Sequence, residues 1–229
     1  MKTMTTLGMV AWGWLAWAGF AQAAELRGHP DSTSWDDLFA PDLSNATYPK
    51  GIWSFDNGVL TATQDRCIWT KKEYENFVLD LEFKNAPGTN SGVFVYCSDV
   101  EDFIPNSVEV QIADDFSPLW SSKPKTWQCA AIFGHLAAKT SAVKRPGEWN
   151  RMTITCQGPK ISVRLNGQQV TEMDMRKWTS AEKNPDGTEI PAWLSKPKAT
   201  LATKGHVGFQ GKHGGAPIYF RNMKIKTLE

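Results

Sequence analysis

The sequence predicts an all-β sandwich of two antiparallel sheets. Three observations favour this fold class: short segments in which apolar and polar residues alternate, Gly, Pro and Asn signals between those segments, and almost no helical periodicity. The 229 residues suffice for one large core, and no repeat or change of composition marks a domain boundary. We therefore expect a single domain over residues 24–229.

The alternation is clearest in four segments. Along residues 78–84, Leu79, Leu81 and Phe83 point one way, and the three charged residues between and after them point the other way. The same period of two recurs at 108–112, 152–156 and 161–165. A Gln-Gly-Pro-Lys run separates the last two segments, and Asn166-Gly167, the strongest short hairpin signal, follows them. We expect consecutive hairpins, each with one apolar face.

Residues 174–203 do not fit this pattern, because they contain three prolines and an Asn-Pro-Asp-Gly turn signal. We expect a long Pro-rich loop laid over one end of the sandwich. Long loops in compact domains are often functional, so this one is expected to wall a binding cleft with Trp178 and Trp193.

The first 23 residues resemble a secretory signal peptide: Lys2, then an apolar run over 7–20, then Ala21-Gln22-Ala23. We expect a mature chain that begins at Ala24 and is exported, with no transmembrane span after removal of the signal, because no second apolar stretch follows. An uncleaved anchor is the alternative.

Cys67, Cys97, Cys129 and Cys156 all lie in the part expected to be exported. An even number of cysteines permits disulfides in an oxidising compartment, and we favour a Cys97–Cys129 bridge among the three pairings. The alternative is a set of buried thiols. No CxxC spacing is present, which argues against a structural zinc site.

Charge and composition exclude two classes of protein. The 25 Lys and Arg residues nearly balance 24 Asp and Glu residues, and no basic run appears, which argues against a nucleic-acid partner. Aromatic residues make up 11% of the chain, which argues against disorder.

Glu109 and Gln111 are the sharpest candidate site residues. They occupy alternate positions of one expected strand, so their side chains share the face opposite the apolar residues 108, 110 and 112. A carboxylate and an amide about 7 Å apart along a strand can bind sugar hydroxyls or serve as a base with an orienting partner. The alternative is a pair of solvent-facing side chains on an ordinary sheet.

His213 lies in a Gly-Lys-His-Gly-Gly loop, where a histidine can abstract a proton near neutral pH or be a plain surface residue. Asn90 begins an Asn-Ser-Gly run that we interpret as a turn leading into a strand, although an Asn there can also bind hydroxyls. The remaining candidates for substrate binding are His135, Gln210, Lys212, Arg221 and Trp69.

A series of motifs runs in order through the chain: WSFDNGVL (53–60), IWTKKEY (68–74), NFVLDLEFK (76–84), NSGVF (90–94), EVQI (109–112), PGEWN (146–150), VRLNG (163–167), and GFQ through HG to FRN (208–222). Together they resemble the 3-keto-disaccharide hydrolase family over about residues 35–229. The resemblance implies a concanavalin A-like lectin/glucanase jelly roll and a secreted bacterial protein, periplasmic or extracellular.

The resemblance also implies an enzyme that cleaves 3-keto-glycosides or 3-keto-disaccharides by base-assisted elimination or by hydrolysis. We expect Glu109 or His213 to be the base, and Lys212 or Arg221 to stabilise the enolate. The sequence implies no cofactor, and a divalent cation remains an alternative as the enolate stabiliser. A second carboxylic acid on a neighbouring strand, Asp80 or Glu82, is a further alternative. A non-catalytic carbohydrate-binding module on the same fold is the alternative from a different class.

Overall fold

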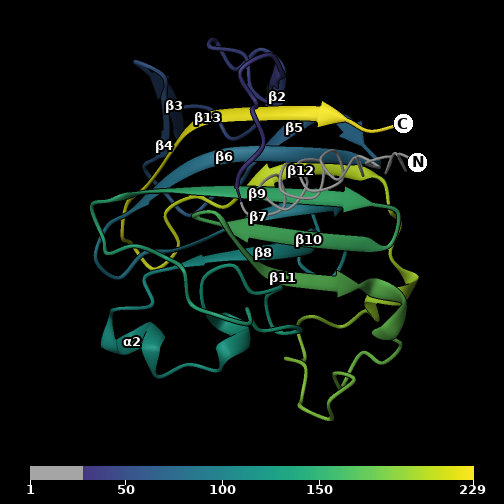
Figure 1. Ribbon diagram of the computed structural model, residues 1–229. Coiled ribbons are helices and arrows are strands. Elements are labelled where there is room, and N and C mark those ends of the chain that lie inside the picture. The colour runs from purple at the N-terminus through teal and green to yellow at the C-terminus, as the bar shows by residue number, and fades with distance from the viewer. Residues whose placement is uncertain (1–27) are drawn as a thin grey trace, which may run out of the picture.

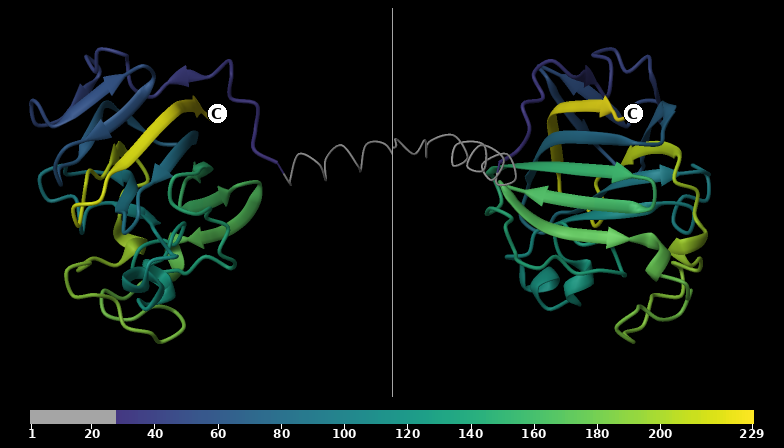
Figure 2. Two further views of the ribbon diagram at one scale, coloured as in Figure 1. Left: turned by 90° about the vertical axis from the view of Figure 1, so that its left-hand side faces the viewer. Right: turned by 45° about the vertical axis from the view of Figure 1, so that its right-hand side comes forward.

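A computed structural model describes residues 28–229, and the expected signal peptide at 1–23 lies outside them. Two antiparallel sheets pack face to face (Figures 1 and 2). The two-sheet antiparallel jelly-roll sandwich predicted from the sequence is confirmed. In the described part of the chain, no helix is long and apolar enough to span a membrane.

Sheet A follows the order β11 (Gln168–Asp174), β10 (Lys160–Leu165), β9 (Trp149–Gln157), β6 (Phe77–Asn85), β13 (Ile218–Thr227), β4 (Val59–Ala62) and β3 (Trp53–Asp56), and β1 (Asp36–Asp37) pairs with β13. Sheet B follows the order β2 (Ala46–Thr47), β5 (Ile68–Tyr74), β12 (Gly205–Phe209), β7 (Asn90–Cys97) and β8 (Val108–Ala113). The short helices are α2 (Pro118–Ser121), η1 (Lys125–Trp127), η2 (Met175–Lys177) and η3 (Lys198–Thr200).

The core lies between the sheets, where the expected apolar faces meet. Leu79, Leu81 and Phe83 of β6 and the apolar residues 108, 110 and 112 of β8 are fully buried in one cluster. Truncation of such an aromatic residue, for example Phe83→Ala, typically costs about 3–5 kcal/mol. This burial fixes the register of β8, so that Glu109 and Gln111 must face outward from sheet B.

The expected hairpins are present. β9 pairs with β10 with Cys156 opposite Ile161, and β10 continues into β11 through Asn166 and Gly167. These two turn residues have positive φ angles of 48° and 83°, the conformation that favours Asn-Gly in a two-residue hairpin loop.

Asp80 of β6 points away from the core as its position predicts, but it is not solvated. The N-terminal segment crosses the outer face of sheet A, and Ser32 donates a hydrogen bond to Asp80 at 2.6 Å. Arg151 forms an ion pair with the same carboxylate at 2.7 Å, and Thr153 donates to it at 2.7 Å. Asp80 therefore anchors the N-terminal segment on sheet A, the sheet opposite the one that carries Glu109.

The expected disulfide is absent, and all four cysteines are free thiols. Cys97 packs with Trp69 and Phe94 on the outer face of sheet B, whereas Cys129 packs in the core between the sheets. The favoured Cys97–Cys129 pairing is therefore wrong, because the two thiols belong to different hydrophobic clusters. Cys156 is also buried in the core, and Cys67 is partly buried beside the outer cluster.

Two irregular segments lie at the same end of the sandwich: residues 114–148, which include α2, and residues 175–204 (Figure 1). The second is held to the first through Asn184, whose side chain donates to the carbonyl of Gly134 at 3.2 Å and accepts from Trp178 at 2.9 Å. Trp178 is thereby buried as an anchor, and Trp193 is left exposed.

Candidate active site

The outer face of sheet B carries side chains in rows that follow the strand pairing. Trp69, Gly208, Phe94 and Glu109 stand opposite one another across β5, β12, β7 and β8. The aromatic end of this row, with Phe103 packed on Phe94 at 5.0 Å between ring centroids, forms a dry cluster beside the carboxylate.

The next row brings two amides to the same face. Gly92 stands opposite Gln111, and the backbone of Gln210 donates a hydrogen bond to the carbonyl of Gly92 at 2.9 Å. Gly92 is part of strand β7 and not of the expected turn. Its missing side chain, and not its backbone freedom, is what matters for the site. A Cβ at this position would overlap the carboxylate of Glu109, so the glycine leaves the space in which that carboxylate lies.

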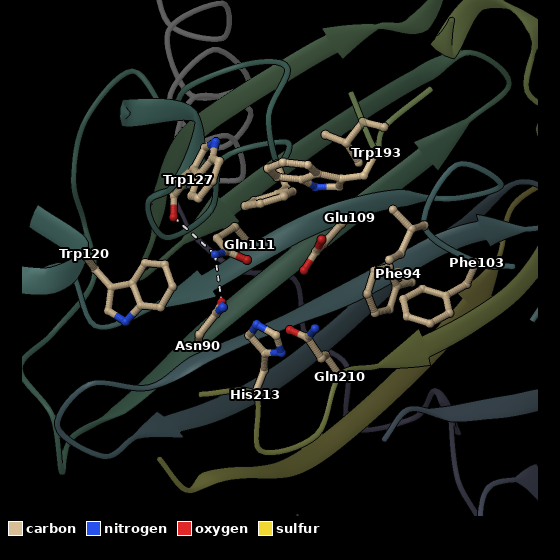
Figure 3. Close-up of a pocket in the computed structure, with 13 residues that line it drawn as sticks. Asn90, Phe94, Phe103, Glu109, Gln111, Trp120, Trp127, Trp193, Gln210 and His213 are labelled. Carbon is tan, nitrogen blue, oxygen red and sulfur yellow. Dashed lines mark hydrogen bonds between the residues drawn. The ribbon is translucent and has the colours of Figure 1, made fainter. Parts of the chain in front are cut away.

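A cavity of about 270 Å³ opens over these rows (Figure 3). Its polar lining consists of Asn90, Glu109, Gln111, Gln210 and His213, all of which are site residues expected from the sequence. Its apolar lining consists of Phe94, Phe103, Ile104, Trp120, Trp127, Phe133, Trp193 and Leu194.

The two irregular segments supply the aromatic wall. Trp127 packs against Phe133 with ring centroids 5.1 Å apart and meets Trp193 edge to face at 6.0 Å. Trp193 lies on the opposite side of Glu109 from His213 and Gln210, and 53% of its surface is exposed (Figure 3). The expectation that the long loop walls a cleft is therefore met by Trp193 and not by Trp178.

Glu109 has the electrostatics of a general acid or base. Burial of its carboxylate raises its pKa to about 8, and the positive charge of Lys198 opposes that rise. Among residues 28–229, no group donates a hydrogen bond to this carboxylate. A desolvated carboxylate without a partner is free to bond to a substrate, and its pKa lies near neutral pH.

Lys198 is the buried cation of the site. Only 2% of its surface is exposed, and its ammonium donates to the carbonyl of Ser107 at 2.9 Å. Burial lowers the pKa of Lys198 to about 8, and the carboxylate of Glu109 opposes that change. The sequence does not point to Lys198, because its place in a Pro-rich loop gives no sign that it is buried near β8.

The amides of the cavity are connected and have unused acceptors. The side chain of Gln111 donates to Asn90 Oδ1 at 3.0 Å and to the carbonyl of Trp127 at 3.2 Å (Figure 3). Within the described part of the chain, Oε1 of Gln111 and Oε1 of Gln210 have no hydrogen-bond partner. Buried acceptors of this kind are costly when unpaired, so they are suited to the hydroxyl donors of a ligand.

His213 reaches the cavity from the segment between β12 and β13, where it forms an isolated bridge with Asn90. Its Nδ1 lies 2.6 Å from Oδ2 of Asp65, and about half of each side chain is exposed. The carboxylate of Asp65 fixes the orientation of the imidazole ring through this contact at Nδ1. Asp65 was not expected from the sequence, because it lies far from His213 along the chain.

Four expected site residues do not line the cavity. Trp69 is buried behind Phe94, and Lys212 precedes His213 without reaching the cavity. His135 is buried with its Nδ1 at 2.7 Å from the carbonyl of Phe133, and burial lowers its pKa to about 4.

Arg221, the fourth, belongs to sheet A, on the other side of the sandwich from the cavity. It forms an ion pair with Glu82 and stacks on Trp149 at 4.0 Å from the ring centroid. Arg221 pairs with Glu82 between β13 and β6 of sheet A. Both residues are therefore separated from Glu109, which lies on sheet B.

The residues of the cavity do not form a metal-binding group. Nowhere between residues 28 and 229 do three or more His, Cys, Asp or Glu side chains converge as metal ligands would.

Comparisons with known proteins give one family and several structural relatives. Residues 28–226 match the model of the 3-keto-alpha-glucoside-1,2-lyase-like domain. A 3-keto-disaccharide hydrolase from Bacteroides thetaiotaomicron is 25% identical over 181 residues, which are 69% of this chain and 60% of that protein. This chain thus spans less than two thirds of the length of that relative.

Among solved structures, a candidate glycosyl hydrolase from Parabacteroides distasonis is 58% identical, with a TM-score of 0.83 over 85% of this chain and 99% of that one. A protein of galectin-like fold from Bacillus subtilis, 14% identical, has a TM-score of 0.50 over 88% of this chain and 93% of that one. The second likeness concerns the fold alone and agrees with a lectin-like jelly roll.

Proposed function

Because the chain belongs to the 3-keto-alpha-glucoside-1,2-lyase-like family, we propose that it cleaves the glycosidic bond of 3-keto-glycosides in the cavity of sheet B, with Glu109 as the base. The family supports an enzyme of the glycosyl hydrolase type that acts on carbohydrate. The observation that carries the assignment of Glu109 is its carboxylate, desolvated and without a hydrogen-bond donor from residues 28–229, with a pKa raised to about 8.

The proposed reaction begins with proton transfer. The C3 ketone acidifies the proton on C2, and the Glu109 carboxylate accepts that proton while the C–H electron pair forms an enolate on the C3 oxygen. Collapse of the enolate forms the C1–C2 double bond and expels the C1 oxygen, which takes a proton and leaves as an alcohol. The other product is an unsaturated 3-keto sugar, and addition of water to its double bond completes a net hydrolysis. A positioned general base contributes about a hundredfold to ten-thousandfold in rate.

The neighbouring polar groups have separate roles in this proposal. Hydroxyls of the sugar donate to the unpaired Oε1 atoms of Gln111 and Gln210. His213, oriented by the contact of its Nδ1 with Asp65, donates through Nε2 to the developing enolate. Lys212 and Arg221 are not assigned this role, because neither lines the cavity.

The apolar wall supports the same chemistry. The six aromatic rings that line the cavity exclude water from around Glu109. A dry site keeps the carboxylate basic and strengthens each hydrogen bond to the enolate.

Export is the second part of the proposal. It rests on the signal-peptide pattern of residues 1–23, with cleavage before Ala24 and a periplasmic or extracellular destination. The mass of the exported protein tests it, and a chain that retains Met1 would contradict it.

Turnover of a methyl 3-keto-glucoside tests the enzymatic proposal. We expect the wild type to release methanol and Glu109→Gln to be at least a hundredfold slower. Glu75→Gln is the matched control, because Glu75 is an exposed glutamate in the turn between β5 and β6, outside the cavity. Equal rates for the Glu109 variant and the control would contradict the role of Glu109.

A carbohydrate-binding module is the second candidate function, and the two unpaired amide acceptors beside an aromatic wall favour it. An enzyme and a module differ in what Glu109→Gln removes. In an enzyme the variant loses turnover and still binds the sugar, whereas in a module the wild type binds sugar without any release of product.

A further inference from the structure

Two large apolar side chains are exposed outside the candidate active site. Among residues 28–229, the exposed large hydrophobic residues are Ile104, Phe116, Leu119 and Trp193. Ile104 and Trp193 line the cavity of sheet B. Phe116 precedes α2 and Leu119 lies within it, with 45% and 56% of their surfaces exposed. Helix α2 stands outside both sheets at one end of the sandwich (Figure 1). Nothing in the proposed cleavage uses these two side chains.

The segment around α2 contains basic residues and no acidic ones. Residues 116–147 include five Lys and Arg residues and neither Asp nor Glu, although the two kinds of charge nearly balance over the whole chain. Lys139 is paired with Glu172, and Lys125 shares a depression with two carboxylates. The remaining cations of the segment form no ion pair with any carboxylate of residues 28–229; they are Lys123, Lys144 and Arg145.

Contacts within the segment bring its apolar and basic side chains together. The guanidinium of Arg145 lies over the ring of Phe116, 4.8 Å from the centroid. The carboxylate of Asp115 accepts hydrogen bonds from the backbone of Cys129 at 2.9 Å and from the hydroxyl of Ser141 at 3.5 Å. These bonds hold the two halves of the segment against each other and occupy the neighbouring carboxylate. We call the α2 face the group formed by Phe116, Leu119, Lys123, Lys144 and Arg145.

We propose that the α2 face docks on the surface of an anionic lipid bilayer. Phe116 and Leu119 enter the boundary between headgroups and acyl chains, and the three cations lie beside lipid phosphates. Apolar side chains flanked by Lys and Arg are the combination by which peripheral proteins bind such surfaces. A soluble polyanion would pair with the cations and leave Leu119 in water, whereas a bilayer takes up both kinds of side chain.

Docking in this way would place the cavity of sheet B close to the membrane. Trp120, the residue after Leu119 in α2, is buried and lines that cavity. No residue of the α2 face lines the cavity itself. Membrane binding is therefore independent of the proposed cleavage, and it is measured without any substrate.

Sedimentation of the exported protein with lipid vesicles tests the proposal. The vesicles contain equal parts of phosphatidylcholine and phosphatidylglycerol, and vesicles of phosphatidylcholine alone are the comparison. One variant, Lys123→Gln/Arg145→Gln, removes two cations of the α2 face. Its matched control is Lys50→Gln/Lys226→Gln, because both lysines are exposed and lie outside residues 114–148. A second variant, Phe116→Ser/Leu119→Ser, removes the apolar side chains, which are exposed and leave no cavity in the core.

Each basic residue near an anionic surface strengthens binding roughly fivefold. We therefore expect Lys123→Gln/Arg145→Gln to bind the phosphatidylglycerol vesicles at least tenfold more weakly than wild type, while the lysine control stays within twofold. Phe116→Ser/Leu119→Ser should also bind at least tenfold more weakly, because the transfer of two apolar side chains out of water is lost. All variants should keep the melting temperature of the wild type.

The wild type provides a second readout that needs no variant. Its binding should be at least tenfold weaker to phosphatidylcholine alone and should fall as salt is added. Absence of binding to the phosphatidylglycerol vesicles, or equal binding to both kinds of vesicle, would overturn the proposal. Equal losses in the α2-face variant and the lysine control would do the same. Binding of dextran sulfate that is as tight in Phe116→Ser/Leu119→Ser as in wild type, without binding to vesicles, would assign the face to a soluble polyanion instead.

Discussion

The carboxylate of Glu109 lies in the space that a side chain at Gly92 would fill. The two residues are diagonal neighbours on paired strands, because Gly92 stands opposite Gln111 while Glu109 stands opposite Phe94. A Cβ on residue 92 would overlap Oε1 of Glu109. The carboxylate of the proposed base can therefore occupy its position only because residue 92 has no side chain.

Gly92→Ala should displace the Glu109 carboxylate and lower kcat/KM for a 3-keto-glycoside at least tenfold. The clash, rather than the backbone, is the cause, since Gly92 lies in a strand and does not have a positive φ angle. A double-mutant cycle with Glu109→Ala checks this by chemical denaturation. Gly92→Ala should lower the free energy of unfolding more in the wild type than in the Glu109→Ala protein. Equal losses of stability in the two backgrounds would contradict the clash.

The pH profile of kcat/KM should rise with pH up to an apparent pKa near 8, the value of the Glu109 carboxyl. Below that pH the partly buried Glu109 carboxyl keeps its proton and cannot accept another from C2. Lys198→Met should move the profile to higher pH, because the buried cation that lowers the pKa of Glu109 is lost. A profile that is flat from pH 6 to 9, or one that moves to lower pH in the variant, is incompatible with this assignment.

The same pKa shift predicts a pH dependence of stability. The pKa of Glu109 is raised from about 4.5 to about 8 on folding, so between these values the unfolded chain has released a proton that the folded chain still holds. The free energy of unfolding therefore falls as pH rises through this window. Urea denaturation at pH 5 and pH 8 should show a smaller fall in Glu109→Gln than in wild type, and an equal fall in both would speak against a raised pKa.

His213→Ala should lower kcat about tenfold to a hundredfold and leave the melting temperature nearly unchanged, because the side chain of His213 is exposed. Asp65→Asn should have a smaller effect in the same direction, since it removes the carboxylate that orients the His213 ring through Nδ1. Kinetics and thermal denaturation of both variants check this. A rate for His213→Ala within twofold of wild type would remove His213 from the mechanism.

The alternating strand pattern of the sequence was sufficient to predict the fold and the residues of one wall of the site. The alternation at 108–112 places Glu109 and Gln111 on the outer face, because the apolar residues between them must be buried in the core. Asn90, Gln210 and His213 were expected, and the structure brings them to the same cavity. Asn90 begins β7 and Gln210 directly follows β12, and buried neighbours fix the registers of both strands.

Other features depend on contacts that are distant in the sequence. Lys198 is buried near β8 by a loop with no periodicity, and Asp65 meets His213 only because β5 and β12 are paired. Arg221 alternates along β13 as a site residue would, but the sequence does not state which sheet β13 joins. The even number of cysteines suggested a bridge, but Cys97 and Cys129 belong to separate clusters.

Exchange of the C2 proton in heavy water measures whether Glu109 abstracts that proton. The substrate is 1-deoxy-3-ketoglucose, which has the C3 ketone but no leaving group at C1, so proton abstraction is measured apart from bond cleavage. We predict that the wild type accelerates loss of the C2 proton signal in the NMR spectrum at least a hundredfold more than Glu109→Gln, while Glu75→Gln behaves like wild type. Exchange in Glu109→Gln within twofold of the wild-type rate would show that another group is the base.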